Sequence, residues 1–270
     1  MPLVVDRLRQ PGPNHPARLS SAVGNAIGKA AQAATTDVRP PTPVAAVVVT
    51  PRAALVRSRL PTLIGLAGLA GFGALFALVR VGRTAALDAA LTIRIQASRN
   101  PALNALMRAA SWPGFPPQSR IIQPLIIGSL AAARLRVEAL SQTLAWGTAL
   151  LSTIVKRFMG RARPVAGKDL RVVAAPLGGS SFPSGHVLTY VGTYGFLAFL
   201  AATLVRPVAL RRLLVGFMVG LVGLVGPSRI QQGHHWPTDV TASYLLGTSY
   251  LLGVVAVYRR LKARRVASRR

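Results

Sequence analysis

The stretch PTLIGLAGLAGFGALFALV, residues 61–79, runs for 19 residues without a charged side chain. A helix needs about 20 mostly apolar residues to cross the hydrocarbon core of a bilayer, within a range of roughly 17–25. We therefore expect a first transmembrane helix here. Five more charge-free stretches follow it along the chain, at residues 121–133, 139–155, 187–205, 213–226 and 240–258.

The composition fits a membrane protein with strongly basic flanks. Of the 270 residues, 51% are hydrophobic, yet the formal net charge is +27 because 33 Lys and Arg stand against 6 Asp and Glu. Such apolarity and charge coexist easily when the apolar residues lie in lipid and the charges lie in the flanks. The chain has no cysteine, which excludes a disulfide-stapled fold, a Cys-based zinc site and a Cys nucleophile.

The six stretches predict an all-α fold, a six-helix transmembrane bundle. The stretches 121–133 and 213–226 are short and need residues from their flanks to span, such as 208–210 for the fifth helix. A soluble protein with buried helices is the alternative. Six charge-free runs in one chain of this length favour the membrane bundle.

Basic residues set the expected orientation of this bundle, because cytoplasmic loops carry the excess of Lys and Arg. The loops after the second and fourth spans contain Arg134, Arg136, Arg206, Arg211 and Arg212. Six spans place these loops and both ends of the chain on one side of the membrane. We therefore expect cytoplasmic termini, with the loops 156–186 and 227–239 facing outward.

Two kinds of segment lie outside the spans. Residues 1–60 hold PGP, RPPTP and many Ala without sustained periodicity, which predicts a disordered basic tail, and residues 259–270 form a second basic tail. Residues 84–112 carry apolar side chains at helical spacing, which predicts one or two interfacial amphipathic helices on the outer leaflet. The breakers WPGFPP at 112–117 end that segment. The expected domains are thus 1–60, a six-span domain at 61–258, and 259–270.

The two outward loops hold most of the reactive polar residues. Lys156, Arg163 and Arg229 lie at the ends of predicted spans, beside histidines and few carboxylates. The planar fork of Arg donates two parallel hydrogen bonds to phosphate oxygens, so this set predicts an anion site with a phosphate dianion as guest. Ser184 and Gly185 open a predicted helix, whose free N–H groups and dipole also favour an anion.

Three short motifs in these loops resemble the signature motifs of the type 2 phosphatidic acid phosphatase superfamily. They are, in chain order, KxxxxxxRP at 156–164, PSGH at 183–186 and SRxxxxxHxxxD at 228–239. That superfamily includes membrane lipid phosphatases, soluble acid phosphatases and vanadium haloperoxidases. The resemblance covers about residues 61–258, and it implies a six-span phosphatase domain of the membrane branch.

The resemblance implies a role for each motif residue. His235 would attack phosphorus and form a phosphohistidine, and Asp239 would accept a hydrogen bond from its other ring nitrogen. His186 would protonate the departing alkoxide and then activate water. The residues that would hold the phosphoryl oxygens are Lys156, Arg163, Ser184, Gly185 and Arg229. No metal or other cofactor is expected, because the cations take the place that a magnesium ion would fill.

A second histidine, His234, stands directly before His235. Composition alone does not choose between them. His235 and Asp239 are four residues apart, which places them on one face of a helix unless the helix begins only at Pro237. The motif spacing also selects His235.

The expected function is an integral membrane lipid phosphatase of a bacterial inner or plasma membrane, with its active site on the outer, periplasmic face. Its substrate would be phosphatidic acid, phosphatidylglycerol phosphate, or a polyprenyl phosphate or diphosphate. The alternatives are a lipid phosphotransferase that uses the same site and a catalytically silent membrane scaffold or carrier. The expected partners are the bilayer and a lipid phosphate, not nucleic acid, and the oligomeric state stays open. The charged residues expected in a solvated loop are Arg157, Arg161, Lys168, Asp169 and Arg171.

Overall fold

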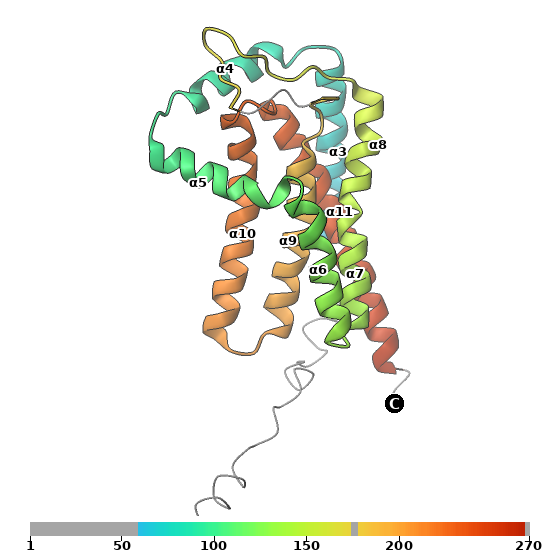
Figure 1. Cartoon of the computed structure of the whole chain (residues 1–270). Helices are drawn as coiled ribbons and strands as arrows, with labels where there is room; N and C mark the ends of the chain where they lie inside the picture. Colours follow the sequence, from blue (N-terminus) through green and yellow to red (C-terminus); the bar gives the residue numbers. More distant parts are fainter. Residues whose placement is uncertain (1–58, 174–177, 268–270) are drawn as a thin grey trace, which may run out of the picture. The chain divides into compact units, whose positions relative to one another are not determined.

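The computed structural model describes residues 59–173 and 178–267, and within these residues the chain forms helices and no strand (Figure 1). The all-α prediction is confirmed. The predicted tail at residues 1–60 lies outside the described part except for its last two residues, and so do residues 268–270. The elements in chain order are α3 (Leu60–Arg80), α4 (Ala85–Gln96), α5 (Pro101–Ser111), the 3-10 turn η2 (Trp112–Gly114), α6 (Gln118–Ala132), α7 (Arg136–Trp146), α8 (Thr148–Met159), α9 (Gly185–Leu204), α10 (Val208–Gln231) and α11 (Pro237–Ala267).

Four of these helices are long and apolar enough to cross a membrane, and they coincide with the first, fourth, fifth and sixth predicted spans. They are Leu60–Arg80, Gly185–Leu204, Val208–Gln231 and Pro237–Arg265. The fifth begins at Val208, as the borrowing of flanking residues requires. A long apolar helix suits the bilayer because it satisfies every backbone hydrogen bond internally.

The second and third predicted spans are not single long helices. α6 has 15 residues, and the third span consists of α7 and α8, which meet at Gly147. The Tyr250 hydroxyl on α11 donates a hydrogen bond of 2.8 Å to the carbonyl of Leu144. A Cβ on Gly147 would lie 2.5 Å from that hydroxyl oxygen. The helix therefore breaks where a side chain from another element contacts its backbone.

α9 lies at the centre of the bundle (Figure 1). In its membrane-length window 61% of the residues are buried, against 11% in α3 and 6% in α10. α9 packs against α10 and α11, and α11 packs against α3. Large apolar side chains of the outer helices, such as Leu66 and Leu213, are exposed. This pattern suits an outer surface that contacts lipid tails, which are as apolar as leucine.

Two shorter helices, α4 and α5, follow α3, and both pack against α10. They confirm the helices predicted within residues 84–112. The side chain of Asn100 caps α5, because its Oδ1 accepts hydrogen bonds of 2.9 and 3.1 Å from the N–H groups of Ala102 and Leu103. The chain therefore turns between the two helices at a defined residue.

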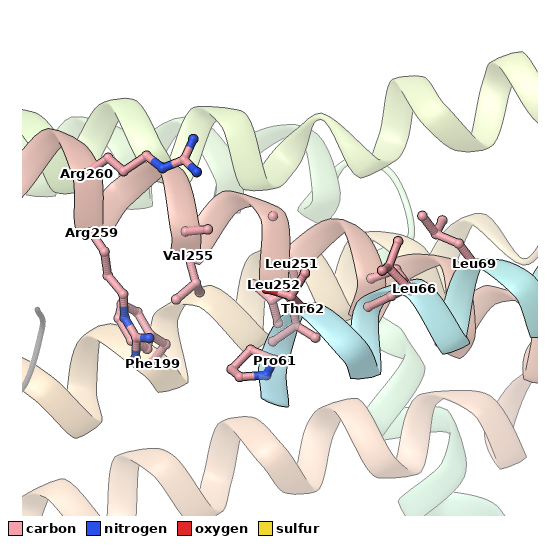
Figure 2. A pocket seen from close by; sticks show the side chains of 14 residues that line it. Pro61, Thr62, Leu66, Leu69, Phe199, Leu251, Leu252, Val255, Arg259 and Arg260 are labelled. Atoms are coloured by element: carbon pink, nitrogen blue, oxygen red, sulfur yellow. The ribbon is translucent and has the colours of Figure 1, made fainter. Parts of the chain in front are cut away.

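The described chain enters and leaves the bundle at one end. Pro61 and Thr62 at the start of α3 line a groove of about 640 Å³ together with Arg259 and Arg260 near the end of α11 (Figure 2). This arrangement agrees with an even number of spans. The reactive loops lie at the other end of the long helices, where α9 and α11 begin (Figure 1).

Candidate active site

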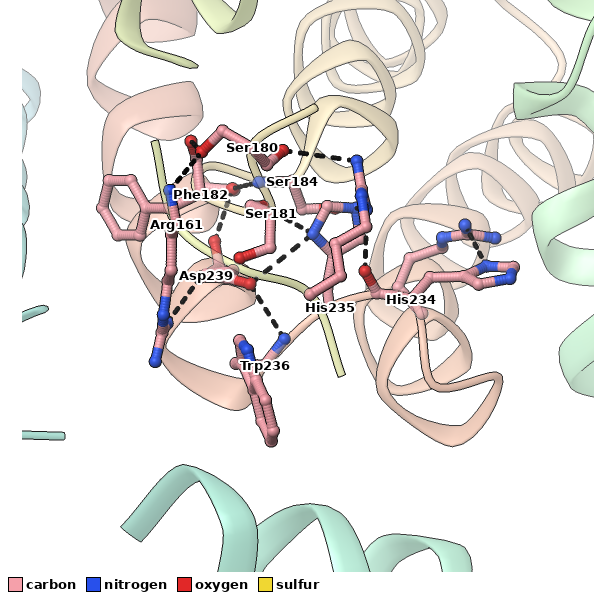
Figure 3. Close-up of polar contacts among 12 residues, drawn as sticks. Arg161, Ser180, Ser181, Phe182, Ser184, His234, His235, Trp236 and Asp239 are labelled. Atoms are coloured by element: carbon pink, nitrogen blue, oxygen red, sulfur yellow. Dashed lines mark hydrogen bonds and ion pairs between the residues drawn. The ribbon is translucent and has the colours of Figure 1, made fainter. Parts of the chain in front are cut away.

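The three sequence motifs come together around the beginnings of α9 and α11 (Figure 3). The first motif covers the end of α8 and the residues that follow it, the second covers the start of α9, and the third joins α10 to α11. Backbone hydrogen bonds connect the described residues between α8 and α9: the N–H of Ser181 donates to the carbonyl of Arg161 at 2.8 Å. Likewise, the N–H of Val173 donates to the carbonyl of Gln232 at 3.1 Å. Val173 is thus fixed to the third motif, and Ser181 to the first.

The ring of His235 has one nitrogen with a defined role. Its Nδ1 lies 2.7 Å from the carbonyl oxygen of Ser181, and a carbonyl only accepts hydrogen bonds. Nδ1 therefore carries the proton of the neutral ring, and Nε2 keeps a lone pair. Nε2 lies 3.3 Å from Nη1 of Arg163. The lone pair on Nε2 of His235 consequently accepts a hydrogen bond from the guanidinium of Arg163.

Asp239 stands beside His235 and acts on its Nδ1, although the nearest acceptor of that nitrogen is the carbonyl oxygen of Ser181. Oδ2 of Asp239 lies 3.7 Å from Nδ1 of His235. That oxygen instead accepts a hydrogen bond of 2.9 Å from the N–H of Trp236. Because α11 begins at Pro237, His235 precedes the helix. The four-residue spacing therefore does not place the side chains of His235 and Asp239 on one helix face. The carboxylate still favours the proton on Nδ1 by its charge.

Burial keeps both neighbouring histidines neutral. It lowers the pKa of His235 to about 4, although the hydrogen-bonding and charge effects of Asp239 act in the opposite direction. Burial, with the cation of Arg229 as the next cause, lowers the pKa of His234 to about 3. At neutral pH His235 is therefore unprotonated on Nε2, which is the state that a nucleophile requires.

This protonation state gives a direct spectroscopic prediction. Burial disfavours the charged imidazolium, so in the folded protein the His235 ring should stay neutral as pH falls, down to about pH 5, and titrate with a midpoint near pH 4. Carbon-13 NMR of histidine-labelled protein in detergent measures this, because the chain has only four histidines and a His235→Gln spectrum identifies the signal. A midpoint at the ordinary histidine value of about 6.5 would contradict the buried, neutral ring.

Lys156 and Arg163 are held by the loop between the first two motifs. Nζ of Lys156 donates a hydrogen bond of 2.5 Å to the carbonyl of Ser180, and Nη2 of Arg163 donates one of 3.3 Å to the same oxygen. Nη1 of Arg163 donates to the carbonyl of His234 at 2.8 Å. The two cations of the first motif are therefore adjacent, as predicted, and one of them contacts His235.

Arg229 is completely buried near the end of α10. Its Nη2 contacts Nδ1 of His234. Its guanidinium carbon lies 4.8 Å from the centre of the Phe115 ring, a cation–π distance. A guanidinium without an exposed face or a carboxylate partner is costly to bury, so this arrangement favours an anion beside it.

Several buried polar atoms of the site have no hydrogen-bond partner among the residues that the structure describes. They are Nε of Arg163, Oγ of Ser184, Nε2 of His186, Nε and Nη1 of Arg229, and Nε2 of His234. Buried polar groups are normally satisfied, and unsatisfied ones mark sites where a ligand completes the set. Guanidinium nitrogens can only donate, so the completing ligand must offer acceptors. A phosphate group, with charge and several oxygens, meets this need.

Ser184 and His186 come from the start of α9. Ser184 precedes the helix, Gly185 is its first residue and His186 its second. The backbone N–H of Ser184 donates a hydrogen bond of 2.7 Å to Oγ of Ser243. That N–H is therefore occupied, and the predicted anion binding by the helix start would use the N–H groups that follow it. The hydroxyl of Ser184 remains without a partner, and His186 interacts electrostatically with Arg229 and His235.

The breaker segment WPGFPP borders His186, a role that sequence reasoning missed. The ring centres of Phe115 and His186 are 4.7 Å apart, and a Cβ on Gly114 would lie 2.3 Å from Cδ2 of His186. Glycine is thus required at residue 114 for the backbone to approach the imidazole this closely. The segment forms an apolar wall beside the histidine.

Two residues expected in a solvated loop are in fact tied to the fold. Arg161 contacts Asp88 and Asp239, each at 2.6 Å. The backbone N–H of Arg171 donates a hydrogen bond of 2.9 Å to the side chain of Gln96. The contact of Asp88 with Arg161 was not predicted from the sequence. Asp88 is an acidic residue inside a predicted amphipathic helix of a strongly basic chain, and that rarity was a signal that could have pointed to it.

The part of the chain that holds this site is similar in sequence to known proteins. Residues 139–263 match the sequence model of the PAP2 superfamily. The chain is 36% identical over 116 residues to lipid A 1-phosphatase of Rhizobium johnstonii. This alignment covers 41% of this chain and 43% of that protein. It is 28% identical over 181 residues to phosphatidylglycerophosphatase B of Bacillus subtilis, covering 64% and 84% of the two chains. The chain thus spans less than half the length of the Rhizobium relative.

A solved structure shares the fold. It is the crystal structure of a transmembrane PAP2-type phosphatidylglycerolphosphate phosphatase from Bacillus subtilis, with a TM-score of 0.61 and 23% sequence identity. The alignment covers 72% of this chain and 94% of that chain. The similarity confirms the helical fold of the bundle.

Proposed function

We propose that the chain is an integral membrane lipid phosphatase, a phosphoric ester hydrolase with a histidine nucleophile, because residues 139–263 match the sequence model of the PAP2 superfamily. The observation that carries this proposal is the group of buried, unpartnered donors on Arg163, Ser184 and Arg229 beside the neutral ring of His235. Cations in a buried site stabilise the charge on the equatorial oxygens of a transferring phosphoryl group. Lys156 lies next to Arg163 and would add a third cation to the set.

The proposed reaction has two steps. In the first, Nε2 of His235 forms a bond to phosphorus while the bond to the lipid oxygen breaks. His186, which the bound phosphate dianion would favour in its protonated form, gives its proton to that oxygen. In the second, neutral His186 takes a proton from water as the water oxygen attacks phosphorus. The nitrogen–phosphorus bond then breaks and inorganic phosphate leaves. Ser181 and Asp239, at 2.7 and 3.7 Å from Nδ1, favour the proton on Nδ1 in both steps.

The proposed placement follows from charge and lipid exposure. The basic loops after the second and fourth spans favour cytoplasmic termini, so the reactive loops would lie at the outer, periplasmic face. The wall of Phe115 and the helices α4 and α5 lie beside this end of the bundle, where the headgroup of a membrane lipid would enter. Domain limits at 61 and 258 remain part of the proposal.

A panel of lipid phosphates tests the function and its substrate class together. Purified protein in detergent would be given phosphatidic acid, phosphatidylglycerol phosphate, a polyprenyl phosphate, a polyprenyl diphosphate and lipid A, and released inorganic phosphate would be measured. We expect at least one lipid to be hydrolysed, with the full rate kept in excess EDTA, because three cations of the chain hold the phosphate. Among the described residues, no cluster of three or more His, Cys, Asp or Glu is placed to hold a metal.

Two outcomes would contradict the proposal. Absence of phosphate release from every lipid would remove the phosphatase assignment. Complete loss in EDTA that added metal restores would remove the mechanism. A parallel incubation with a second lipid alcohol shows whether phosphate passes to that alcohol instead of water, which is the phosphotransferase alternative.

A further inference from the structure

Arg161 forms a bridge between two buried carboxylates. Its Nη2 lies 2.6 Å from Oδ2 of Asp88, and its Nη1 lies 2.6 Å from Oδ1 of Asp239. The side chain of Arg161 is 14% exposed, and those of Asp88 and Asp239 are 1% and 0% exposed. Figure 3 shows the Arg161 side chain reaching Asp239 from the loop that follows α8. Charge-assisted pairs of this kind, between one largely buried guanidinium and two buried carboxylates, fix the geometry of all three groups.

The outer end of the bridge also holds the start of α11. Oδ1 of Asp88 accepts a hydrogen bond of 2.9 Å from the N–H of Thr238, and Oδ2 accepts one of 2.8 Å from its hydroxyl. Thr238 is the second residue of α11, whose first N–H groups have no acceptor within the helix. Asp88, which belongs to α4, therefore caps α11 from another element and places a negative charge at its positive end. Helix α4 and the third motif are locked together.

The backbone of Arg161 is also connected to His235, through Ser180 and Ser181. Its carbonyl accepts a hydrogen bond of 2.8 Å from the N–H of Ser181, and its N–H donates one of 3.0 Å to Oγ of Ser180. The carbonyl of Ser181 is the acceptor that lies 2.7 Å from Nδ1 of His235. Arg161 thus positions both groups that face Nδ1: Ser181 through its main chain and Asp239 through its side chain.

We propose that Arg161 and Asp88 are positioning residues for the phosphoryl transfer at His235. This inference rests on the proposed function. Neither residue contacts the unpartnered donors of the phosphate site, so their effect passes through Asp239 and Ser181. The bridge of two carboxylates and one guanidinium carries a net negative charge beside Nδ1–H. It keeps that proton in place and stabilises the positive charge that develops on the imidazole as Nε2 bonds to phosphorus.

The fork of arginine is suited to this position in a way that lysine is not. Two nitrogens of one planar group contact one carboxylate each, whereas a single ammonium is a compact point charge that cannot keep both contacts at this geometry. Removal of the guanidinium leaves two buried carboxylates close together without a counter-charge. The carboxylate of Asp239 would then turn away from His235, and its alignment would be lost.

The test compares Arg161→Met, Arg161→Lys, Asp88→Asn and the double variant Arg161→Met/Asp88→Asn with the wild type on the lipid phosphate that the panel identifies. Arg157→Met is the matched control, since Arg157 is an exposed arginine near the end of α8. Folding is checked by size-exclusion chromatography and thermal unfolding in detergent. The readouts are kcat, KM and the rate of phosphoenzyme formation.

We expect kcat to fall about 100-fold in Arg161→Met and about tenfold in Asp88→Asn, with KM within about threefold of wild type. Arg161→Lys should lie between Arg161→Met and wild type, and Arg157→Met should match wild type. Because both residues act through one bridge, the double variant should lose no more than Arg161→Met alone. Phosphoenzyme formation should slow by the same factor as kcat.

Three results would overturn the inference. One is a folded Arg161→Met protein with wild-type kcat, and another is a loss confined to KM, which would make Arg161 a substrate contact. If Arg161→Met does not fold, Arg161→Lys and Asp88→Asn decide the test, and unfolding of all three variants would show a purely structural bridge. A wild type that releases no phosphate from any lipid is a separate failure, that of the proposed function itself.

Discussion

His235→Ala is expected to lower lipid phosphate hydrolysis by roughly five orders of magnitude, the size of loss seen when a nucleophile is removed from a cooperating catalytic set. The physical reason is the defined ring of His235: Nδ1 donates to Ser181, so only Nε2 has a lone pair, and that nitrogen faces Arg163. Alanine has no atom that could attack phosphorus. Phosphate release from the best lipid of the panel measures the loss, with folding checked by thermal unfolding.

His234→Ala is the matched control for this variant. His234 is equally buried, but its Nδ1 is occupied by the contact with Arg229. We expect a reduced but measurable rate in His234→Ala, since Arg229 loses a neighbour while the nucleophile stays. The reverse result, with His235→Ala active and His234→Ala inactive, would show that His234 is the nucleophile and would contradict our assignment.

Arg229→Met should lower kcat/KM by about a thousandfold, which is the lower range for loss of an arginine that stabilises a transferring phosphoryl group. Its Nε and Nη1 are buried and unpartnered, so they have hydrogen bonds to give to phosphoryl oxygens. Methionine fills a similar volume without charge. Because an uncompensated buried charge is itself destabilising, we expect the variant to unfold at the same or a higher temperature than wild type. Inhibition by vanadate should weaken in parallel.

Arg212→Met is the control, because Arg212 lies exposed at the other end of the same helix. It should leave kcat/KM and vanadate inhibition unchanged. The account of the phosphate site would be contradicted by an Arg229→Met protein that keeps wild-type kcat/KM. A loss of activity that comes with a lower unfolding temperature would instead show that Arg229 stabilises the fold.

The long helices could be predicted from the sequence because a charge-free run is a local signal. The runs at 61–79, 187–205 and 240–258 each became one long helix. The run at 139–155 did not, because Tyr250 contacts the backbone at Leu144 and breaks the helix at Gly147. That contact joins residues more than 100 positions apart, and no local pattern contains it.

The contacts of the candidate site also divide into those that the sequence indicated and those that it did not. Motif spacing brought Arg163 and His235 into contact as predicted, since each lies at a helix end that the topology gathers. Asp239 lies 3.7 Å from Nδ1 of His235, and Ser181 is the nearer acceptor, because α11 begins only at Pro237 and His235 precedes it. Arg161 and Asp88 were missed because their pairing depends on where α4 lies over the start of α11. Three-dimensional placement of an amphipathic helix cannot be read from its periodicity.

The central claim is that His235 attacks phosphorus without a metal ion, and trapping the intermediate tests it most directly. Wild-type protein would be mixed with the hydrolysed lipid phosphate in excess EDTA, quenched in alkali, where phosphohistidine survives, and digested for mass spectrometry. We predict a phosphoryl group on His235, absent from His235→Ala and still present in His234→Ala. A phosphoryl group on another residue, or steady turnover with no phosphoenzyme at any quench time, would contradict the account.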